Sequence, residues 1–303
     1  MPSDTAPFEY VATFIARPEQ AASLSEVVDE AADLPGAGRP DWLADGEACD
    51  IPLPPAENGL GAIRADLYEM VDGRPVDVVA QPIAGRRKKL IVADMDSTMI
   101  GQECIDELAD MVGLKPHVAA ITERAMRGEI AFEPALRERV ALLKGLELAV
   151  VEKVLAERIT LMPGGPVLIR TMKASGAYAA LVSGGFTLFT GPVAAMIGFD
   201  ENHGNVLELD GAAFRGTVRE PILGREAKLA NLKRLRTEKG LAESETLAIG
   251  DGANDLDMLR EAGLGVAFHA KPAVAAAAHA RVDHGDLTAL LYAQGYSRYA
   301  FVA

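Results

Sequence analysis

The chain has 303 residues, of which 49% are hydrophobic, and this length suits two domains of about 100 to 200 residues each. Its formal net charge of −14 argues against a basic surface that grips nucleic acid regardless of sequence. No apolar run approaches a membrane span, the N-terminus lacks a secretion signal, and the two cysteines lie far apart. We therefore expect a cytoplasmic protein that binds neither nucleic acid nor membrane.

Residues 1–85 are predicted to form a small α+β domain. An apolar strand is expected over residues 10–16, a helix around Leu24, and strands near Ile51 and over residues 76–79. The alternation of strands and helices is similar to small ligand-sensing domains of amino-acid metabolism. Two interpretations stay open: an amino-acid-sensing domain, or a unit that only packs against the rest of the chain or a second copy in a homodimer.

A short basic run, Arg86 to Lys89, stands directly before an apolar strand. It could mark a localisation signal or a phosphate-binding patch. Its position favours a solvated lead-in at a domain junction instead.

Residues 86–303 alternate short apolar runs with helical stretches, which indicates an α/β fold. Strands are expected over residues 90–93, 179–182, 247–249 and 265–267. This alternation predicts a Rossmann-like parallel sheet with crossover helices. Polar and glycine residues follow the first three strands directly, at the sheet edge where open α/β folds bind ligands.

Between the first two of these strands, residues from about 100 to 162 have an almost wholly helical pattern. The expected helices cover residues 103–112, 118–127 and 132–143. Because this is too long for a plain crossover, we interpret it as a helical cap inserted over the strand edge. A β-hairpin is predicted over residues 206–218, with Asp210 and Gly211 as its turn.

Two acidic sites follow apolar strands. Asp94 and Asp96 end the first strand, and a pair of neighbouring carboxylates is costly without a divalent cation with oxygen ligands, such as Mg²⁺. Asp251 follows Gly250, where glycine lets the backbone bend toward the neighbouring strand ends. The alternative in each case is an ordinary solvated turn.

Ser183, Gly184 and Lys228 could surround a phosphate group. A hydroxyl and bare backbone amides can bind phosphate oxygens, and a lysine adds a compact positive charge. Taken singly, these residues have the simpler interpretation of a loop and a solvated surface lysine.

The order DMDST, SGG, Lys228, GDGAND resembles the haloacid-dehalogenase-like phosphohydrolase superfamily. The resemblance implies that Asp94 is the nucleophile, Asp96 the acid and base, and Lys228 a charge-stabilising residue. It also implies that Mg²⁺ is held by Asp94, the backbone carbonyl of Asp96, and Asp251.

The last of these motifs carries two further residues. By the same resemblance, Asn254 reaches the phosphate, and Asp255 supports Lys228 and the metal ligands.

Two segments, DMDSTMIGQECIDELA and AMRGEIAFEPALRERVALLKGL, further resemble phosphoserine phosphatases. The resemblance implies that Glu103 and Arg139 hold the amino-acid end of the substrate and that Phe132 covers it. A phosphorylated amino acid presents an ammonium and a carboxylate, which these two charges would pair with. The implied activity is Mg²⁺-dependent hydrolysis of phosphoserine to serine and phosphate, the last step of serine biosynthesis.

Two rival functions remain at this point. The same fold could pass phosphate from Asp94 to another hydroxyl as a phosphotransferase, or the chain could be a non-catalytic, amino-acid-sensing regulatory protein. The presence of Asp94, Asp96, Ser183, Lys228 and Asp251 together favours a working catalytic site.

Overall fold

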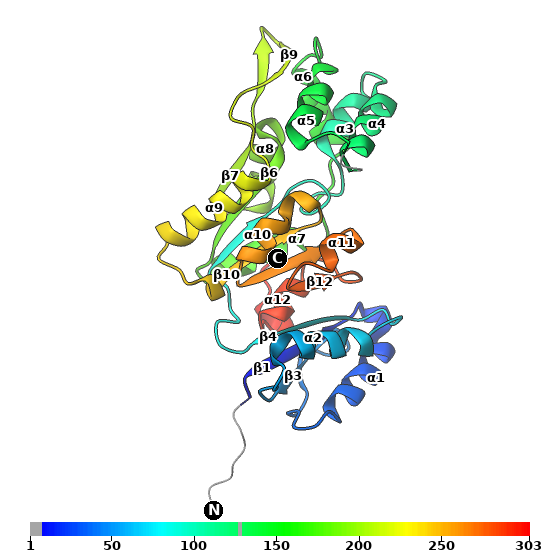
Figure 1. Ribbon diagram of the computed structural model, residues 1–303, viewed down its shortest axis with the longest axis vertical. Helices are drawn as coiled ribbons and strands as arrows, with labels where there is room; N and C mark the ends of the chain where they lie inside the picture. Colours follow the sequence, from blue (N-terminus) through cyan, green and yellow to red (C-terminus); the bar gives the residue numbers. More distant parts are fainter. Residues whose placement is uncertain (1–7, 127–128) are drawn as a thin grey trace, which may run out of the picture.

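The computed structural model describes residues 8–126 and 129–303. Figure 1 shows an elongated molecule with the N-terminal unit at one end, the helices of the insertion at the other, and a parallel sheet between them. Among the described residues, no helix is both long and apolar enough to cross a membrane.

The N-terminal unit is a four-stranded antiparallel sheet with two helices. Its elements are β1 (Tyr10–Ile15), α1 (Ala21–Ala32), β2 (Asp41–Ala44), β3 (Ala48–Leu53), α2 (Gly59–Met70) and β4 (Asp77–Pro82), and the strand order is β2-β3-β1-β4. The predicted pattern lacked β2. That strand has four residues and an exposed Trp42, so it gives no apolar alternation to recognise.

The two faces of this sheet belong to different hydrophobic cores. Phe14 packs in the core under α1 and α2, whereas Ile15 and Val79 join the large core of the rest of the chain. Successive strand residues point to opposite faces, so the sheet is sandwiched between its own helices and the following unit. Residue 85, where the sequence predicts a domain boundary, lies between β4 and the next strand. The division into two domains stays a prediction.

Buried polar contacts join the N-terminal unit to the rest of the chain. Arg86 binds both carboxylate oxygens of Asp50 at 2.6 and 2.7 Å and donates to the carbonyl of Ala293 at 2.8 Å. Its side chain is only 15% exposed, so the prediction of a solvated lead-in is wrong for this residue. The partner that buries it lies 36 residues earlier, beyond the reach of local sequence pattern.

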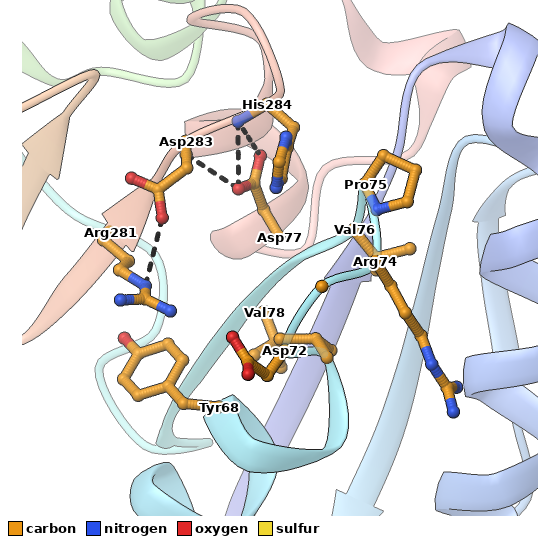
Figure 2. A pocket seen from close by; sticks show the side chains of 12 residues that line it. Tyr68, Asp72, Arg74, Pro75, Val76, Asp77, Val78, Arg281, Asp283 and His284 are labelled. Carbon is orange, nitrogen blue, oxygen red and sulfur yellow. Dashed lines mark hydrogen bonds and ion pairs between the residues drawn. The ribbon is translucent and has the colours of Figure 1, made fainter.

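Asp77 makes a second contact of this kind beside a surface pocket. Figure 2 shows its carboxylate facing the backbone of Asp283 and His284. It accepts hydrogen bonds from their N–H groups at 2.7 and 3.2 Å. It also accepts the N–H of Gly285 at 2.7 Å. One buried carboxylate of the N-terminal unit therefore fixes the chain that follows the last strand of the parallel sheet.

The second sheet has six parallel strands, and it confirms the α/β prediction. The strands are β5 (Leu90–Ala93), β6 (Tyr178–Phe186), β7 (Glu201–Asn205), β10 (Thr246–Gly250), β11 (Leu264–Phe268) and β12 (Ala280–Val282), in the order β12-β11-β10-β5-β6-β7. The four predicted strands are present. The edge strands β7 and β12 were missed, because β7 is polar and β12 has three residues.

The helices of this unit connect or cover the parallel strands. They are α7 (Gly165–Ala174), α8 (Thr187–Ile197), α9 (Arg225–Glu238), α10 (Leu256–Glu261), α11 (Pro272–Ala275) and α12 (Ala289–Ala293). Helix α9 carries Lys228 on its buried side, which places a charged residue beneath the carboxyl edge of the sheet.

The insertion after β5 is helical. Its helices are α3 (Cys104–Asp110), α4 (Lys115–Met126), α5 (Phe132–Ala141) and α6 (Ala149–Glu157). The predicted end of the second helix at residue 127 lies outside the described residues. The two chain connections to the insertion run side by side, since Ile100 bridges Leu161 and Met162 donates to the carbonyl of Met99 at 2.9 Å.

The predicted hairpin is present as β8 (Leu207–Asp210) and β9 (Ala213–Val218). It lies beside the cap in Figure 1, and the N–H of Gly145 donates to the carbonyl of Phe214 at 2.8 Å. The hairpin thus anchors the end of α5, the helix that carries Phe132 and Arg139.

Candidate active site

A pocket lies between the carboxyl ends of β5, β6 and β10 and the cap. Every predicted site residue except Lys228 and Asp255 lines it: Asp94, Asp96, Glu103, Phe132, Arg139, Ser183, Gly184, Asp251 and Asn254. Lys228 and Asp255 are fully buried and contact each other beside Asp94. Residues from six separate elements or loops therefore meet at one place.

Three carboxylates cluster at this pocket: Asp94 and Asp251 line it, and Asp255 is fully buried beside them. Asp94, Asp251 and Asp255 each offer an oxygen within 4.8 Å of the others. Burial, and then the charge of Asp94, raises the pKa of Asp251, because its carboxylate loses water and faces a like charge. Thr98 donates a hydrogen bond to Asp251 at 3.1 Å. Clustered hard oxygen donors of this kind fit a divalent cation.

Lys228 supplies the positive charge that this cluster needs. Its ammonium lies 2.7 Å from Asp94 and 2.6 Å from Asp255. Burial alone would lower the pKa of Lys228, but the two carboxylates outweigh burial and raise it, so the side chain stays charged. Asp255 also accepts the N–H of Gly252 at 3.1 Å. Both of its oxygens are thus used in holding Lys228 and the loop after β10.

Asp96 also lines the pocket and has a different environment. Its carboxylate accepts the N–H of Cys104 at 3.3 Å. Burial first, and then the charge of Glu103, raises the pKa of Asp96 well above its usual value. A raised pKa favours the protonated carboxyl group, which is the form that a general acid needs.

The close approach of Gly185 to Asp96 gives a testable prediction. A Cβ at Gly185 would lie 2.9 Å from the Asp96 carboxylate and 3.1 Å from the Ser183 hydroxyl. The Gly185→Ala variant should therefore displace Asp96 and lower kcat by about tenfold to a hundredfold, since catalytic groups tolerate little misplacement. The matched Gly191→Ala variant, whose added methyl meets nothing within 4 Å, should keep wild-type kcat. Equal rates for the two variants would show that Asp96 needs no such fixed position.

The cap contributes charged residues of both signs to the pocket. Glu103 precedes α3 and accepts a hydrogen bond from the Ser97 hydroxyl at 2.8 Å. Arg139 on α5 donates to the carbonyl of Ala135 at 3.2 Å and to the Thr122 hydroxyl at 3.3 Å. One carboxylate and one guanidinium therefore face the same pocket as Asp94.

Phe132 packs against two glycines that the core of the sheet presents to the cap. A Cβ at Gly184 would lie 3.2 Å from its ring, and one at Gly224 would lie 3.3 Å from it. Asn205, which is buried, joins the end of β6 to the segment before α9. Its amide donates to the carbonyls of Gly184 and Leu223 at 2.8 and 3.0 Å.

Some features of the pocket differ from the sequence prediction or were missed by it. The segment 183–185 was expected as a loop after the strand, but β6 continues to Phe186 with an irregular register. Thr122, Leu136 and Arg225 also line the pocket. The helices of Thr122 and Leu136 were predicted, but tertiary packing rather than a motif decides which turn of each helix faces the sheet.

Comparison with known proteins agrees with this geometry. The family model of the haloacid dehalogenase-like hydrolases matches residues 91–260. A phosphoserine phosphatase of Streptomyces coelicolor is 46% identical over 226 residues, which cover 75% of this chain and 55% of the relative. A phosphoserine phosphatase of Albidiferax ferrireducens is 45% identical over 217 residues, which cover 70% of this chain and 92% of the relative. The chain therefore spans little more than half the length of the first relative and most of the second.

A solved structure matches a similar share of the chain. It is a phospho-aspartyl intermediate analogue of a phosphoserine phosphatase, with 38% sequence identity and a TM-score of 0.63. The match covers 68% of this chain and 98% of the other.

Proposed function

The chain belongs to the haloacid dehalogenase-like hydrolases, and on that premise we propose that it hydrolyses O-phosphoserine to serine and phosphate. The observation that carries this proposal is the shared pocket. It joins the carboxylates Asp94 and Asp96 to one anionic and one cationic residue, Glu103 and Arg139. Hydrolysis of any phosphate ester would need the two aspartates, whereas recognition of a phosphorylated amino acid would also need the two charged residues for its ammonium and carboxylate.

Asp94 is the nucleophile. Lys228 and the N–H of Met95 hold its two carboxylate oxygens at 2.7 and 2.8 Å, so the group is fixed before substrate arrives. An oxygen of Asp94 attacks phosphorus, the bond from phosphorus to the serine oxygen breaks, and an aspartyl phosphate forms. The Lys228 ammonium offsets the repulsion between the carboxylate and the incoming dianion.

Asp96 moves the proton in both halves of the reaction. It donates its proton to the departing serine oxygen, which would otherwise leave as a strongly basic alkoxide. The resulting carboxylate then takes a proton from the water that attacks the aspartyl phosphate. The bond from Asp94 to phosphorus breaks, phosphate leaves, and Asp96 is protonated again.

The donor set around Asp94 fits Mg²⁺. Carboxylate oxygens of Asp94 and Asp251 and the backbone carbonyl of Asp96 would hold it, and a bound divalent cation supplies positive charge that stabilises the transferring phosphoryl oxygens. Asp255 stays with Lys228, whose ammonium it contacts at 2.6 Å.

The remaining residues bind the substrate. The Ser183 hydroxyl accepts the N–H of Gly185 at 2.9 Å, which leaves its hydrogen free to donate to a phosphate oxygen. Gly184 and Asn254 line the same side of the pocket. Glu103 pairs with the substrate ammonium, Arg139 with its carboxylate, and Phe132 covers it from the cap.

The test of this proposal is phosphate release from a panel of esters. We expect phosphoserine to give a far higher kcat/KM than sugar and nucleotide monophosphates of similar phosphate chemistry, and chelation with EDTA to abolish release. Preference for one of the other esters would keep the Asp94 chemistry and refute the substrate. Full activity after exhaustive chelation would refute the proposed metal requirement.

A further inference from the structure

Arg139 is oriented by contacts with uncharged oxygen atoms. Its Nε donates to the Ala135 carbonyl at 3.2 Å, and its Nη1 donates to the Thr122 hydroxyl at 3.3 Å. Neither acceptor is charged, so these two bonds orient the guanidinium, while the carboxylates of Asp106, Glu103 and Asp96 act on its charge from nearby. Within residues 8–126 and 129–303, these are the two hydrogen bonds of the guanidinium, and its other N–H groups can make a planar, two-bond contact with a carboxylate.

Thr122 is itself held in place. Its hydroxyl donates to the carbonyl of Val118 at 3.1 Å, one turn earlier in α4. A hydroxyl has one hydrogen and two lone pairs, so this bond leaves the oxygen as an acceptor for Arg139. Thr122 lies on α4 and Arg139 on α5, so the contact ties the two cap helices together where both line the pocket.

Glu103, the residue of opposite charge in the pocket, also has a hydroxyl group as its hydrogen-bond partner. The Ser97 hydroxyl donates to Glu103 at 2.8 Å, so each charged residue of the amino-acid-reading pair has a hydroxyl partner. Both are long side chains that lose rotamer freedom when they are fixed, and a hydroxyl partner restricts that freedom before the substrate binds.

We propose that Thr122 is a positioning residue that aims Arg139 and thereby sets the preference for phosphate monoesters that carry a carboxylate. The proposal rests on the proposed function, in which Arg139 binds the substrate carboxylate. Thr122 does not touch the reacting atoms. Its removal is therefore expected to alter substrate preference rather than phosphoryl chemistry.

The test compares two substrates in the Thr122→Val variant, which keeps the side-chain shape and removes the hydroxyl. Phosphoserine carries a carboxylate, and O-phosphoethanolamine has the same phosphate ester and ammonium without it. We expect kcat/KM for phosphoserine to fall about tenfold, as for loss of a hydrogen bond to a charged group, mainly through KM. The kcat/KM for O-phosphoethanolamine should stay near its wild-type value. Thr122→Ser, which keeps a hydroxyl group, should show the wild-type preference for phosphoserine.

A matched control and a second background show whether Thr122 acts through Arg139. Thr237 on α9 makes the same hydroxyl bond to the carbonyl four residues earlier, at 2.9 Å, but on an exposed surface. Thr237→Val should leave both constants unchanged. In an Arg139→Ala background, Thr122→Val should have no further effect on the preference.

The outcomes separate the two claims. If the wild-type protein does not prefer phosphoserine to O-phosphoethanolamine, the proposed reading of the carboxylate is wrong, and this inference falls with it. If wild type prefers phosphoserine and a folded Thr122→Val keeps that preference, or the effect persists without Arg139, only the inference is overturned. If circular dichroism shows that Thr122→Val does not fold, Thr122→Ala removes the same hydroxyl without adding apolar bulk. An unchanged preference for phosphoserine in Thr122→Ala would also overturn the inference.

Discussion

Replacement of Asp94 by Asn is expected to lower kcat by about a thousandfold or more, because the amide cannot attack phosphorus as the carboxylate does. Asn has nearly the same shape, and the N–H of Met95 keeps an oxygen acceptor at this position. The fold should therefore survive, as judged by circular dichroism and thermal unfolding. The measurement is steady-state phosphate release from phosphoserine.

A matched control uses Asp210, which lies exposed at the end of β8, next to the hairpin turn. Asp210→Asn removes the same charge far from the sheet edge and should keep wild-type kcat. Comparable activity in Asp94→Asn and Asp210→Asn would refute the nucleophile. It would also revive the interpretation of the chain as a protein without this catalytic mechanism.

Replacement of Lys228 by Met should damage both activity and stability. The ammonium is fully buried between Asp94 and Asp255, so its loss leaves three clustered carboxylates without their cation. We expect kcat to fall by at least about a hundredfold, as for loss of one charge-stabilising donor. The free energy of unfolding should fall by about 3–5 kcal/mol, as when one partner of a buried ion pair is removed.

The control for Lys228 is a surface ion pair of the same kind. Lys173 lies 2.7 Å from Asp200, but its side chain is 34% exposed. Lys173→Met should therefore change the free energy of unfolding by no more than about 1 kcal/mol. A Lys228→Met protein with the stability and kcat of Lys173→Met would contradict the role given to the buried ammonium.

Much of the candidate site could be predicted from the sequence because several of its residues follow buried strands directly. In a parallel sheet, strand ends meet at one edge, so Asp94, Ser183 and Asp251 were expected near one another before their positions were known. The buried Lys228 is different. A helical lysine has the pattern of a surface residue, and only the family resemblance pointed to its place between two carboxylates.

The contacts that could not be predicted join residues far apart in the chain. Arg86 pairs with Asp50 across the junction between the two sheets, and Asn205 joins Gly184 at the end of β6 to Leu223. Such contacts depend on strand order and helix rotation, which local periodicity does not encode. The short edge strands β2 and β12 were missed for a related reason, since pairing with a neighbour rather than their own composition makes them strands.

The most direct test of the account is to trap the covalent intermediate during turnover of phosphoserine. Hydroxylamine converts an aspartyl phosphate into an aspartyl hydroxamate, which mass spectrometry locates in a protease digest. The account predicts the hydroxamate at Asp94, only when phosphoserine and Mg²⁺ are both present, and none in the Asp94→Asn variant. A hydroxamate at another residue, or rapid turnover with none at all, would contradict phosphoryl transfer through Asp94.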